Sequence, residues 1–205
     1  AYTTVLEDSS IEDCIQKAVS NSKITEKDEY NYLPKDEEIV LKNKLIDDSL
    51  LFKESFLDYS VEDKIALSKK LEILTLNKDK KITDIENVIY NDNIYETAIL
   101  NSTGFCDKYK ATSCFIYVNA ISKEKDDTST GDFFGCGRTP ADLDLDRIAG
   151  KAADRSVSIL GGKKIKSQKA TLILDPVVST QFLGIIADGI TADAVQKKKS
   201  LFEGR

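Results

Sequence analysis

The side chains of this 205-residue chain that could do chemistry are mainly carboxylates and thiols, because the sequence contains no histidine. Asp175, Asp188 and Asp193 lie near one another in the last third of the sequence, so a metal site built from carboxylates alone is the first chemistry to consider. Acidic residues at helix ends usually cap the helix or remain in water. We therefore expect no metal at these three residues.

The four cysteines are the second set of reactive groups. Cys14, Cys106, Cys114 and Cys136 contain no C-x-x-C pair, and no histidine is present to complete a zinc site with them. Cys106 and Cys114 could face each other across a hairpin and oxidise, although a buried free cysteine is the commoner case. Free thiols suit the reducing cytosol, and a cysteine or serine nucleophile would find only lysine or a carboxylate as its base.

Two short stretches have compositions that also occur at binding sites. Residues 131–137 are rich in glycine but lack the G-x-x-x-x-G-K-[ST] pattern that holds phosphates, so we interpret them as a strand end leading to a loop. Residues 197–199 are three lysines. Such a run ordinarily lies in water at a helix end, and a partner-binding patch is the alternative.

The charge balance argues against nucleic acid as a direct partner. The formal net charge is -6, and the arginines are Arg138, Arg147, Arg155 and Arg205, whereas binding to a phosphate backbone needs a concentrated basic face. No apolar run approaches the roughly 20 residues that span a bilayer, and the first residues show no secretory signal pattern. We expect a globular, cytoplasmic protein that binds neither nucleic acid nor a membrane.

Two helices are predicted in the first part of the chain. Ser9 and Glu12 form a predicted capping box, and apolar residues then recur at helical spacing, which predicts a helix over residues 10–20 that packs on one face. Residues 21–58 are predicted to connect it to the next element, and residues 36–44 could form a helical turn or two. Ser60 is predicted to cap a second helix, which ends near residue 77.

An alternation of apolar and polar residues from Lys81 to about Phe134 predicts an antiparallel meander with one face in water. The predicted strands are Ile82–Tyr90, Tyr95–Asn101, Phe105–Lys110, Cys114–Ile121 and Thr128–Phe134, and the turns are Asn91–Asn93, Ser102–Gly104 and Lys123–Asp127.

A helix, a strand and a second helix are predicted next. An apolar stripe predicts a helix over about residues 144–160, closed by Gly161 and Gly162. Leu172–Leu174 is apolar on both faces, which predicts a central strand over residues 170–175.

The helix after Pro176 is the last long element of the sequence. Ser179 or Thr180 is expected to cap it, and its apolar spacing continues to Ile190. Ile185 and Ile186 are expected to face the core, and Thr191 is expected to begin a further short helix.

Five motifs in the last third of the chain occur in a recognisable order. They are Arg138-Thr-Pro-Ala-Asp-Leu-Asp, Ile148-Ala-Gly-Lys-Ala-Ala-Asp-Arg, Leu160-Gly-Gly-Lys-Lys, Ala170-Thr-Leu-Ile-Leu-Asp-Pro and Ser200-Leu-Phe-Glu-Gly. Together they resemble the PmbA/TldE branch of the TldD/PmbA family, whose members are often called modulators of DNA gyrase. Family members begin before the equivalent of Ala1 and continue past Arg205, and this sequence contains no methionine. We therefore expect the chain to be an internal fragment of a longer protein.

The resemblance also locates the motif that carries zinc in the catalytic branch of the family. That motif is His-Glu-x-x-x-His on the helix after the apolar strand, and its two histidines bind the metal. The resemblance places Gly184, Ile185 and Gly189 at the positions of the first histidine, the glutamate and the second histidine. It therefore implies no catalytic residue and no metal ligand in this chain, and it leaves Asp188 as a candidate contact for substrate or partner.

The fold implied by the resemblance is α+β, with a mixed α/β portion and antiparallel meander first and a helix-strand-helix opening a second domain. Residues 1–140 would form the C-terminal part of an N-terminal domain, and residues 141–205 would begin the C-terminal domain.

The implied function is that of the non-catalytic, TldE-like subunit of a cytosolic zinc metalloprotease complex that processes or degrades peptides. Its implied partner is a TldD-like paralogue that carries the zinc, and a homodimer is an option when the chain is alone. Two alternatives stay open. One is a catalytic metallopeptidase with ligands outside this chain, and the other is a cytosolic binding module without a link to proteolysis.

Overall fold

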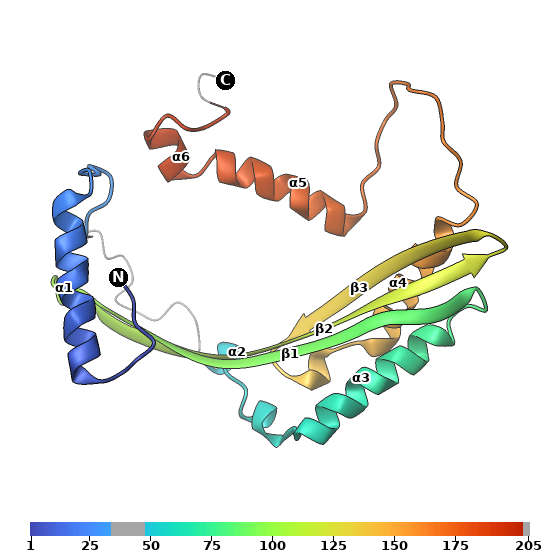
Figure 1. Cartoon of the computed structure of the whole chain (residues 1–205), viewed down its shortest axis with the longest axis horizontal. Helices are drawn as coiled ribbons and strands as arrows, with labels where there is room; N and C mark the ends of the chain where they lie inside the picture. The colour runs from blue at the N-terminus through green and yellow to red at the C-terminus, as the bar shows by residue number, and fades with distance from the viewer. Residues whose placement is uncertain (34–47, 203–205) are drawn as a thin grey trace. The chain divides into compact units, whose positions relative to one another are not determined.

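The computed structural model describes residues 1–33 and 48–202 of the chain, and Figure 1 traces them from blue to red. The contacts divide the chain into two compact units, which are residues 35–168 and residues 1–34 together with 169–205. We describe each unit by itself. The helices and the antiparallel sheet confirm the α+β class. The expected domain boundary near residue 140 stays a prediction.

The unit of residues 35–168 is built on a three-stranded antiparallel sheet. Its strands are β1 (Ile82–Leu100), β2 (Cys106–Glu124) and β3 (Asp127–Gly137), in the order β1-β2-β3. The predicted antiparallel meander is therefore confirmed, with three long strands in place of five short ones. Gly104 adopts a φ of 90° in the first connection and Lys125 a φ of 57° in the second, so the turns predicted at these two places are confirmed.

The turn predicted at Asn91–Asn93 is wrong. Asn91, Asp92 and Asn93 lie inside β1 and pair with Phe115, Cys114 and Ser113 of β2. Asparagine and aspartate favour turns locally, but the backbone hydrogen bonds of a continuous ladder outweigh that preference. The pairing of β1 with β2 continues to Leu100 and Cys106, well beyond the last pair of β2 with β3 at Cys114 and Gly137. A two-stranded ribbon therefore extends from the sheet, as Figure 1 shows.

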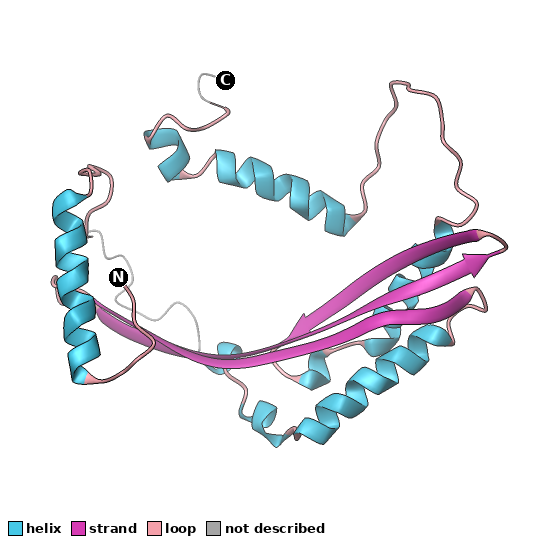
Figure 2. Cartoon of the chain, in the orientation of Figure 1, coloured by secondary structure: helices cyan, strands magenta, loops and turns pink. Residues whose placement is uncertain are grey.

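One face of the sheet is the core of this unit. Alternate residues of β2 are fully buried on that face, among them Ile116, Val118 and Ala120. The helices α3 (Val61–Leu76) and α4 (Leu145–Ser158) pack against it, with α3 next to β1 and α4 next to β3 (Figure 2). Residues of the opposite face, such as Ile89 and Phe134, remain exposed, as expected for an antiparallel sheet with one wet side.

The predicted helix after Ser60 is confirmed as α3. The Ser60 side chain accepts a hydrogen bond from the Asp63 backbone N–H at 3.1 Å, and the Asp63 carboxylate accepts one from the Ser60 backbone N–H at 2.9 Å. The Ser60 hydroxyl also donates a 2.7 Å hydrogen bond to the Asp63 carboxylate, and this bond, followed by the one from the Ser60 backbone N–H, lowers the pKa of Asp63. The capping box therefore sets the residue at which α3 begins.

The glycine-rich end of β3 allows α4 to approach the sheet closely. A side chain at Gly131 would place its Cβ 2.1 Å from the Ser156 backbone nitrogen, and one at Gly135 would lie 2.6 Å from Ile148. Gly137 ends β3 and leads into a loop, as predicted. Helix α4 itself confirms the predicted helix over about 144–160, and Gly161 follows it with a φ of 75°.

The segment before α3 was predicted to be a connection. Residues 34–47 lie outside the described residues. The described end of the segment contains α2 (Asp48–Leu51) and a 3-10 helix (Glu54–Asp58). Phe56 of the 3-10 helix is buried, so this part of the connection contributes to the core.

The other unit contains α1 (Asp8–Ile24), α5 (Pro176–Gly189) and α6 (Ala192–Gln196). The predicted cap of α1 is wrong. Ser9 was expected to cap this helix, but the N-cap residue is Glu7, and no side chain forms a capping hydrogen bond. No residue of α1 is buried, so the expected packing of one face is also wrong within this chain. Thr191 caps α6 as predicted, through a 3.2 Å bond from Ala194 N–H to its hydroxyl.

The central strand predicted over residues 170–175 is wrong in this chain. These residues form no strand, and Ile173 is 97% exposed. A strand that is apolar on both faces requires hydrogen-bonded neighbours and cover on two sides, and the described residues of this unit provide neither. The predicted cap of the next helix is wrong as well, since Ser179 or Thr180 was expected to cap it. Instead, Asp175 caps α5 by accepting a 2.9 Å hydrogen bond from Val177 N–H.

No helix in the described part of the chain is both long enough and apolar enough to cross a membrane.

Candidate functional site

The residues that the sequence placed at the zinc-motif positions lie on α5. Gly184 has open space around it, since a Cβ added there would meet no atom within 4 Å. Gly189 is the opposite case, because an added Cβ would lie 2.7 Å from the Phe202 ring. The Ser200 hydroxyl also donates a 2.5 Å hydrogen bond to the Gly189 carbonyl. The space for a second ligand is therefore already filled by the chain itself.

The prediction that Ile185 and Ile186 face the core is wrong, because these side chains are 65% and 46% exposed. An apolar periodicity predicts that a helix face will be covered, but it does not say which surface covers it. Within this chain α5 presents these side chains to the outside.

The three carboxylates near α5 do not form one cluster. Asp175 caps the start of α5, and Asp188 is exposed near its end. Asp193 lies on α6 and forms a 2.6 Å ion pair with Lys197. In the residues that the structure describes, no three cysteine, aspartate or glutamate residues gather in a way that could hold a metal ion.

Lys197 has a structural contact that the sequence did not predict. Its ammonium lies 2.6 Å from Asp193 and 2.6 Å from Asp28, which follows α1. The hydrogen bonds to Asp193 and then Asp28 raise the pKa of Lys197. The hydrogen bond from Lys197 lowers the pKa of Asp28. Lys197 therefore joins the two sequence-distant parts of this unit, whereas the lysine run was expected to lie free in water.

The residues of α5 do not fit the zinc ion of the catalytic branch. Protein zinc sites use histidine, cysteine and carboxylate ligands in a tetrahedral arrangement. The whole sequence contains no histidine, and both positions that the resemblance assigns to the ligands are glycine. We therefore assign no zinc chemistry to these residues.

The cysteines are separate thiols. Cys106 and Cys114 lie on the same strand, β2, and pair with Leu100 and Asp92 of β1, so they do not face each other across a hairpin. Burial, with a smaller effect from Asp142, raises the pKa of Cys114 to about 11. The Cys114 thiol is therefore protonated near neutral pH, and a protonated thiol is a poor nucleophile.

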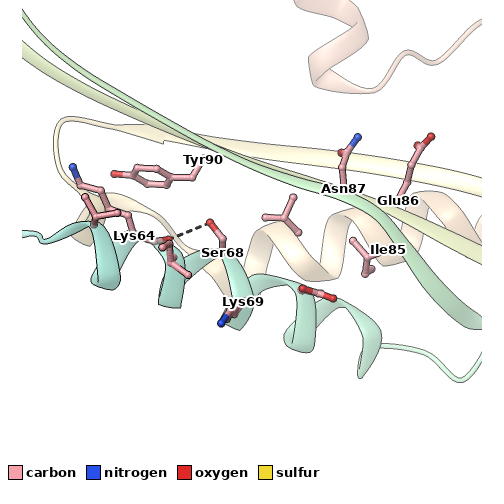
Figure 3. Close-up of a pocket in the computed structure, with 11 residues that line it drawn as sticks. Lys64, Ser68, Lys69, Ile85, Glu86, Asn87 and Tyr90 are labelled. Carbon is pink, nitrogen blue, oxygen red and sulfur yellow. Dashed lines mark hydrogen bonds between the residues drawn. The ribbon is translucent and has the colours of Figure 1, made fainter.

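Sequence analysis missed a groove between α3 and β1, shown in Figure 3. Its volume is about 610 Å³, within the roughly 300–1,000 Å³ range typical of ligand sites. The helix contributes Val61, Ile65, Ser68 and Lys69 among others, and the strand contributes Ile85, Val88 and Tyr90.

One end of this groove is closed by a polar cluster. The Lys64 ammonium lies 2.6 Å from the Asp92 carboxylate and 5.3 Å from the centre of the Phe56 ring. The Tyr90 hydroxyl donates a 3.1 Å hydrogen bond to Asp92. Burial, followed by the charge of Asp92, raises the pKa of Tyr90. Since Lys64 and Asp92 neutralise each other, this end offers no free charge to an anion.

A signal for the groove was present in the sequence. Helix α3 has apolar residues on more than one side, including the exposed Val61 and Ile65 as well as the buried Leu71. A helix that is apolar around much of its circumference is usually covered on more than one side. The sequence did not indicate where the second cover would lie.

The comparisons with known proteins agree on one family. A family model described as the PmbA/TldA metallopeptidase central domain matches residues 54–160. The chain is 28% identical over 144 residues to the metalloprotease PmbA homolog of Buchnera aphidicola from Acyrthosiphon pisum, covering 70% of this chain and 32% of that protein. The chain thus spans about a third of the length of this curated relative.

Two solved structures share the fold. A proposed modulator of DNA gyrase from Bacteroides thetaiotaomicron superposes with a TM-score of 0.80 at 25% identity, covering 96% of this chain and 44% of that one. TldE from Thermococcus kodakarensis superposes with a TM-score of 0.56 at 19% identity, covering 72% of this chain and 32% of that one. The second likeness concerns the fold alone.

Proposed function

Because this chain belongs to the PmbA/TldD metallopeptidase family, we propose that it is part of a non-catalytic, zinc-free subunit that acts on peptides together with a zinc-bearing paralogue. One observation carries the proposal. The sequence contains no histidine, and the resemblance places Gly184 and Gly189 where the catalytic branch has its two histidines.

The contacts of α5 support a role other than metal binding. The Phe202 ring fills the space beside Gly189, so even a side chain introduced there would first have to displace it. The exposed Ile185 and Ile186 and the nearby Asp188 leave α5 with an apolar surface and one carboxylate. We assign this surface to contact with the paralogue or with the peptide, in the cytoplasm, where such a complex would meet unfolded chains.

The proposal is tested by separating and recombining the two subunits. The full-length protein containing this chain is purified alone, and it is mixed with the zinc-bearing paralogue from the same cell. We expect a stable complex whose peptide cleavage is abolished by a chelator, and no cleavage by the zinc-free protein alone. A paralogue whose own motif histidines are replaced serves as the control, because it should bind without cleaving.

The same experiment distinguishes the alternatives. Chelator-sensitive cleavage by the isolated protein would show a catalytic metallopeptidase with ligands elsewhere. Absence of any complex at micromolar concentration would favour a binding module without a link to proteolysis. Formation of a homodimer that dissociates when the paralogue is added agrees with the proposal.

A further inference from the structure

The connection from α4 to α5 is the longest described stretch of the chain that contains neither helix nor strand. It runs from Ile159 to Asp175, and Figure 1 draws it as an extended loop. Both of its ends are held by hydrogen bonds. Gly161 N–H donates to the Asp127 carboxylate at 2.6 Å, and the Asp175 carboxylate accepts from Val177 N–H at the start of α5.

The middle of this connection has no hydrogen bond to hold its backbone. Within the part of the chain that the structure describes, residues 163–173 form no hydrogen bond, and all of them are exposed. Such a backbone can change its conformation without breaking native contacts, whereas a helix or strand must first open. Exposed loops that carry small and polar residues are the places where proteases preferentially cut a folded protein.

Lysine is the commonest residue in the first half of this free stretch. Lys163, Lys164, Lys166 and Lys169 fall within seven residues, and the sequence contains no acidic residue from position 155 to position 174. No ion pair within the described chain involves any of these four lysines. Endopeptidases that cut after lysine hold its ammonium group with a carboxylate in a pocket, and no acidic neighbour in this stretch competes for that contact.

The lysines in the turns of the unit of residues 35–168 lie in a different setting. Lys78 follows α3 and forms a 2.8 Å ion pair with Asp146. Lys125 occupies the short turn between β2 and β3, where its φ is 57°. Hydrogen-bonded elements flank both turns, so a protease could bind either turn in an extended form only after part of a helix or strand had opened.

We infer that residues 163–169 are a processing site for an endopeptidase that cleaves after lysine. The enzyme hydrolyses one peptide bond. The oxygen of a water molecule bonds to the lysine carbonyl carbon, the C–N bond breaks, and the amine of the next residue takes a proton from that water. The cut leaves the sheet with α3 and α4 on one product and α5 with α6 on the other. This inference holds whether or not the chain works in a protease complex.

The N-terminal product should resist further cutting within its folded part. It keeps every buried hydrophobic residue of the described chain, from Phe56 to Ala153. Cutting inside α3, α4 or the sheet needs an opened state, which a stable domain populates rarely. We therefore expect the protease to stop at a stable fragment that ends at one of the four lysines.

The inference is tested by limited digestion of the purified full chain with endoproteinase Lys-C, and mass spectrometry follows each bond separately. A synthetic peptide of residues 160–173 gives the cutting rate of the unprotected segment. We expect the segment in the chain to be cut within about tenfold of the peptide, and the bonds after Lys78 and Lys125 at least about a hundredfold more slowly. Cutting of the segment about a hundredfold more slowly than the peptide would overturn the inference, because the segment would then be protected.

A variant separates the accessibility of the segment from its lysines. Replacement of all four lysines by glutamine should abolish cutting there by Lys-C, whereas subtilisin, which does not require lysine, should still cut first within residues 163–173. Lys78→Gln is the control and should leave the rapid cut unchanged. Circular dichroism checks that both variants fold. Subtilisin cutting within residues 61–158 before residues 163–173 would refute the inference, since the connection would not be the most accessible part of the chain.

Discussion

The unit of residues 35–168 and the unit of residues 1–34 with 169–205 both contain amphipathic helices, yet they use them differently. Every described hydrophobic residue that is buried lies in the first unit, from Phe56 to Ala153. In the second unit α1 and α5 bury none of their residues. An apolar stripe on a helix predicts that this face of the helix will be covered by another surface. The comparison shows that such a stripe can stay uncovered within the described residues of the chain that carries it.

The largest expected effect tests the buried side of this comparison. Leu71 of α3 is fully buried in the core between helix and sheet. Leu71→Ala should lower the free energy of unfolding by about 2–5 kcal/mol, because it removes buried apolar surface and leaves a cavity. Urea unfolding followed by circular dichroism measures it. A loss below about 1 kcal/mol would contradict the packing of α3 described here.

The close approach of α4 to β3 gives the second prediction. Gly131→Ala would place a methyl group 2.1 Å from the Ser156 backbone nitrogen. We expect a loss of about 1–3 kcal/mol or somewhat more, since backbone rather than a flexible side chain must move. Gly150→Ala in α4 is the control. A Cβ at Gly150 meets nothing within 4 Å, so that change should stabilise the helix by about 0.5–1 kcal/mol. Equal effects of the two would contradict the contact.

A pH dependence in the same unit gives the third prediction. The pKa of Asp142 is lowered, first by the Thr139 backbone N–H at 2.8 Å and then by Arg138 N–H at 2.9 Å. A carboxylate with a lowered folded-state pKa stabilises the protein above its unfolded-state pKa of about 3.9, and this stability is lost as the pH falls through the folded-state value.

Asp142→Asn should therefore cost about 1 kcal/mol at pH 7 and less at pH 3. Unfolding curves at both pH values measure the difference. A cost that is the same at both would show that the ionised carboxylate is not what holds this turn.

The smallest expected effect on stability tests the exposed side of the comparison. With Ile186 expected in the core, an Ile186→Asp substitution would have buried an unpaired charge at a cost of several kcal/mol. Because Ile186 is 46% exposed, we now expect a change within about 0.5 kcal/mol for this chain. The same substitution should weaken binding to the zinc-bearing paralogue. Ile173→Asp, at a more exposed position of the same unit, is the control.

An outcome in which Ile186→Asp unfolds the chain would show that α5 is covered within it. An outcome in which stability and binding to the paralogue both stay unchanged would remove α5 from the proposed interface.

Local features of the fold followed from the sequence where a single interaction sets them. Ser60 and Asp63 satisfy each other's backbone groups within one turn, so the start of α3 was predictable. The apolar stripe of α4 and the left-handed Gly161 were predictable for the same reason. The lengths of the strands were not, since the continuity of β1 through Asn91–Asn93 depends on a partner strand about twenty residues away.

The features of the candidate site also fall into those that the sequence predicted and those that it did not. Composition shows that the chain contains no histidine ligand, whereas the assignment of the ligand positions to Gly184 and Gly189 rests on the resemblance and stays a prediction. The sequence did not identify the Phe202 ring beside Gly189 or the groove beside Ile65, since both depend on contacts between separate elements. The sequence also wrongly predicted a central strand at Leu172–Leu174. Such an apolar strand needs neighbouring strands and cover on both faces, and the described residues of this unit provide neither.

The ribbon formed by β1 and β2 beyond Cys114 has a consequence for local motion. A ribbon of two strands is only marginally stable in water without further cover, and here it continues from a sheet with a packed core. Opening can therefore start at the Ser102–Gly104 turn and stop where β3 begins to pair, without unfolding the rest. The β2 amide protons that are hydrogen-bonded to β1 should exchange with solvent progressively more slowly from Asp107 toward Tyr117. Exchange along this one strand would then range from local opening to global unfolding.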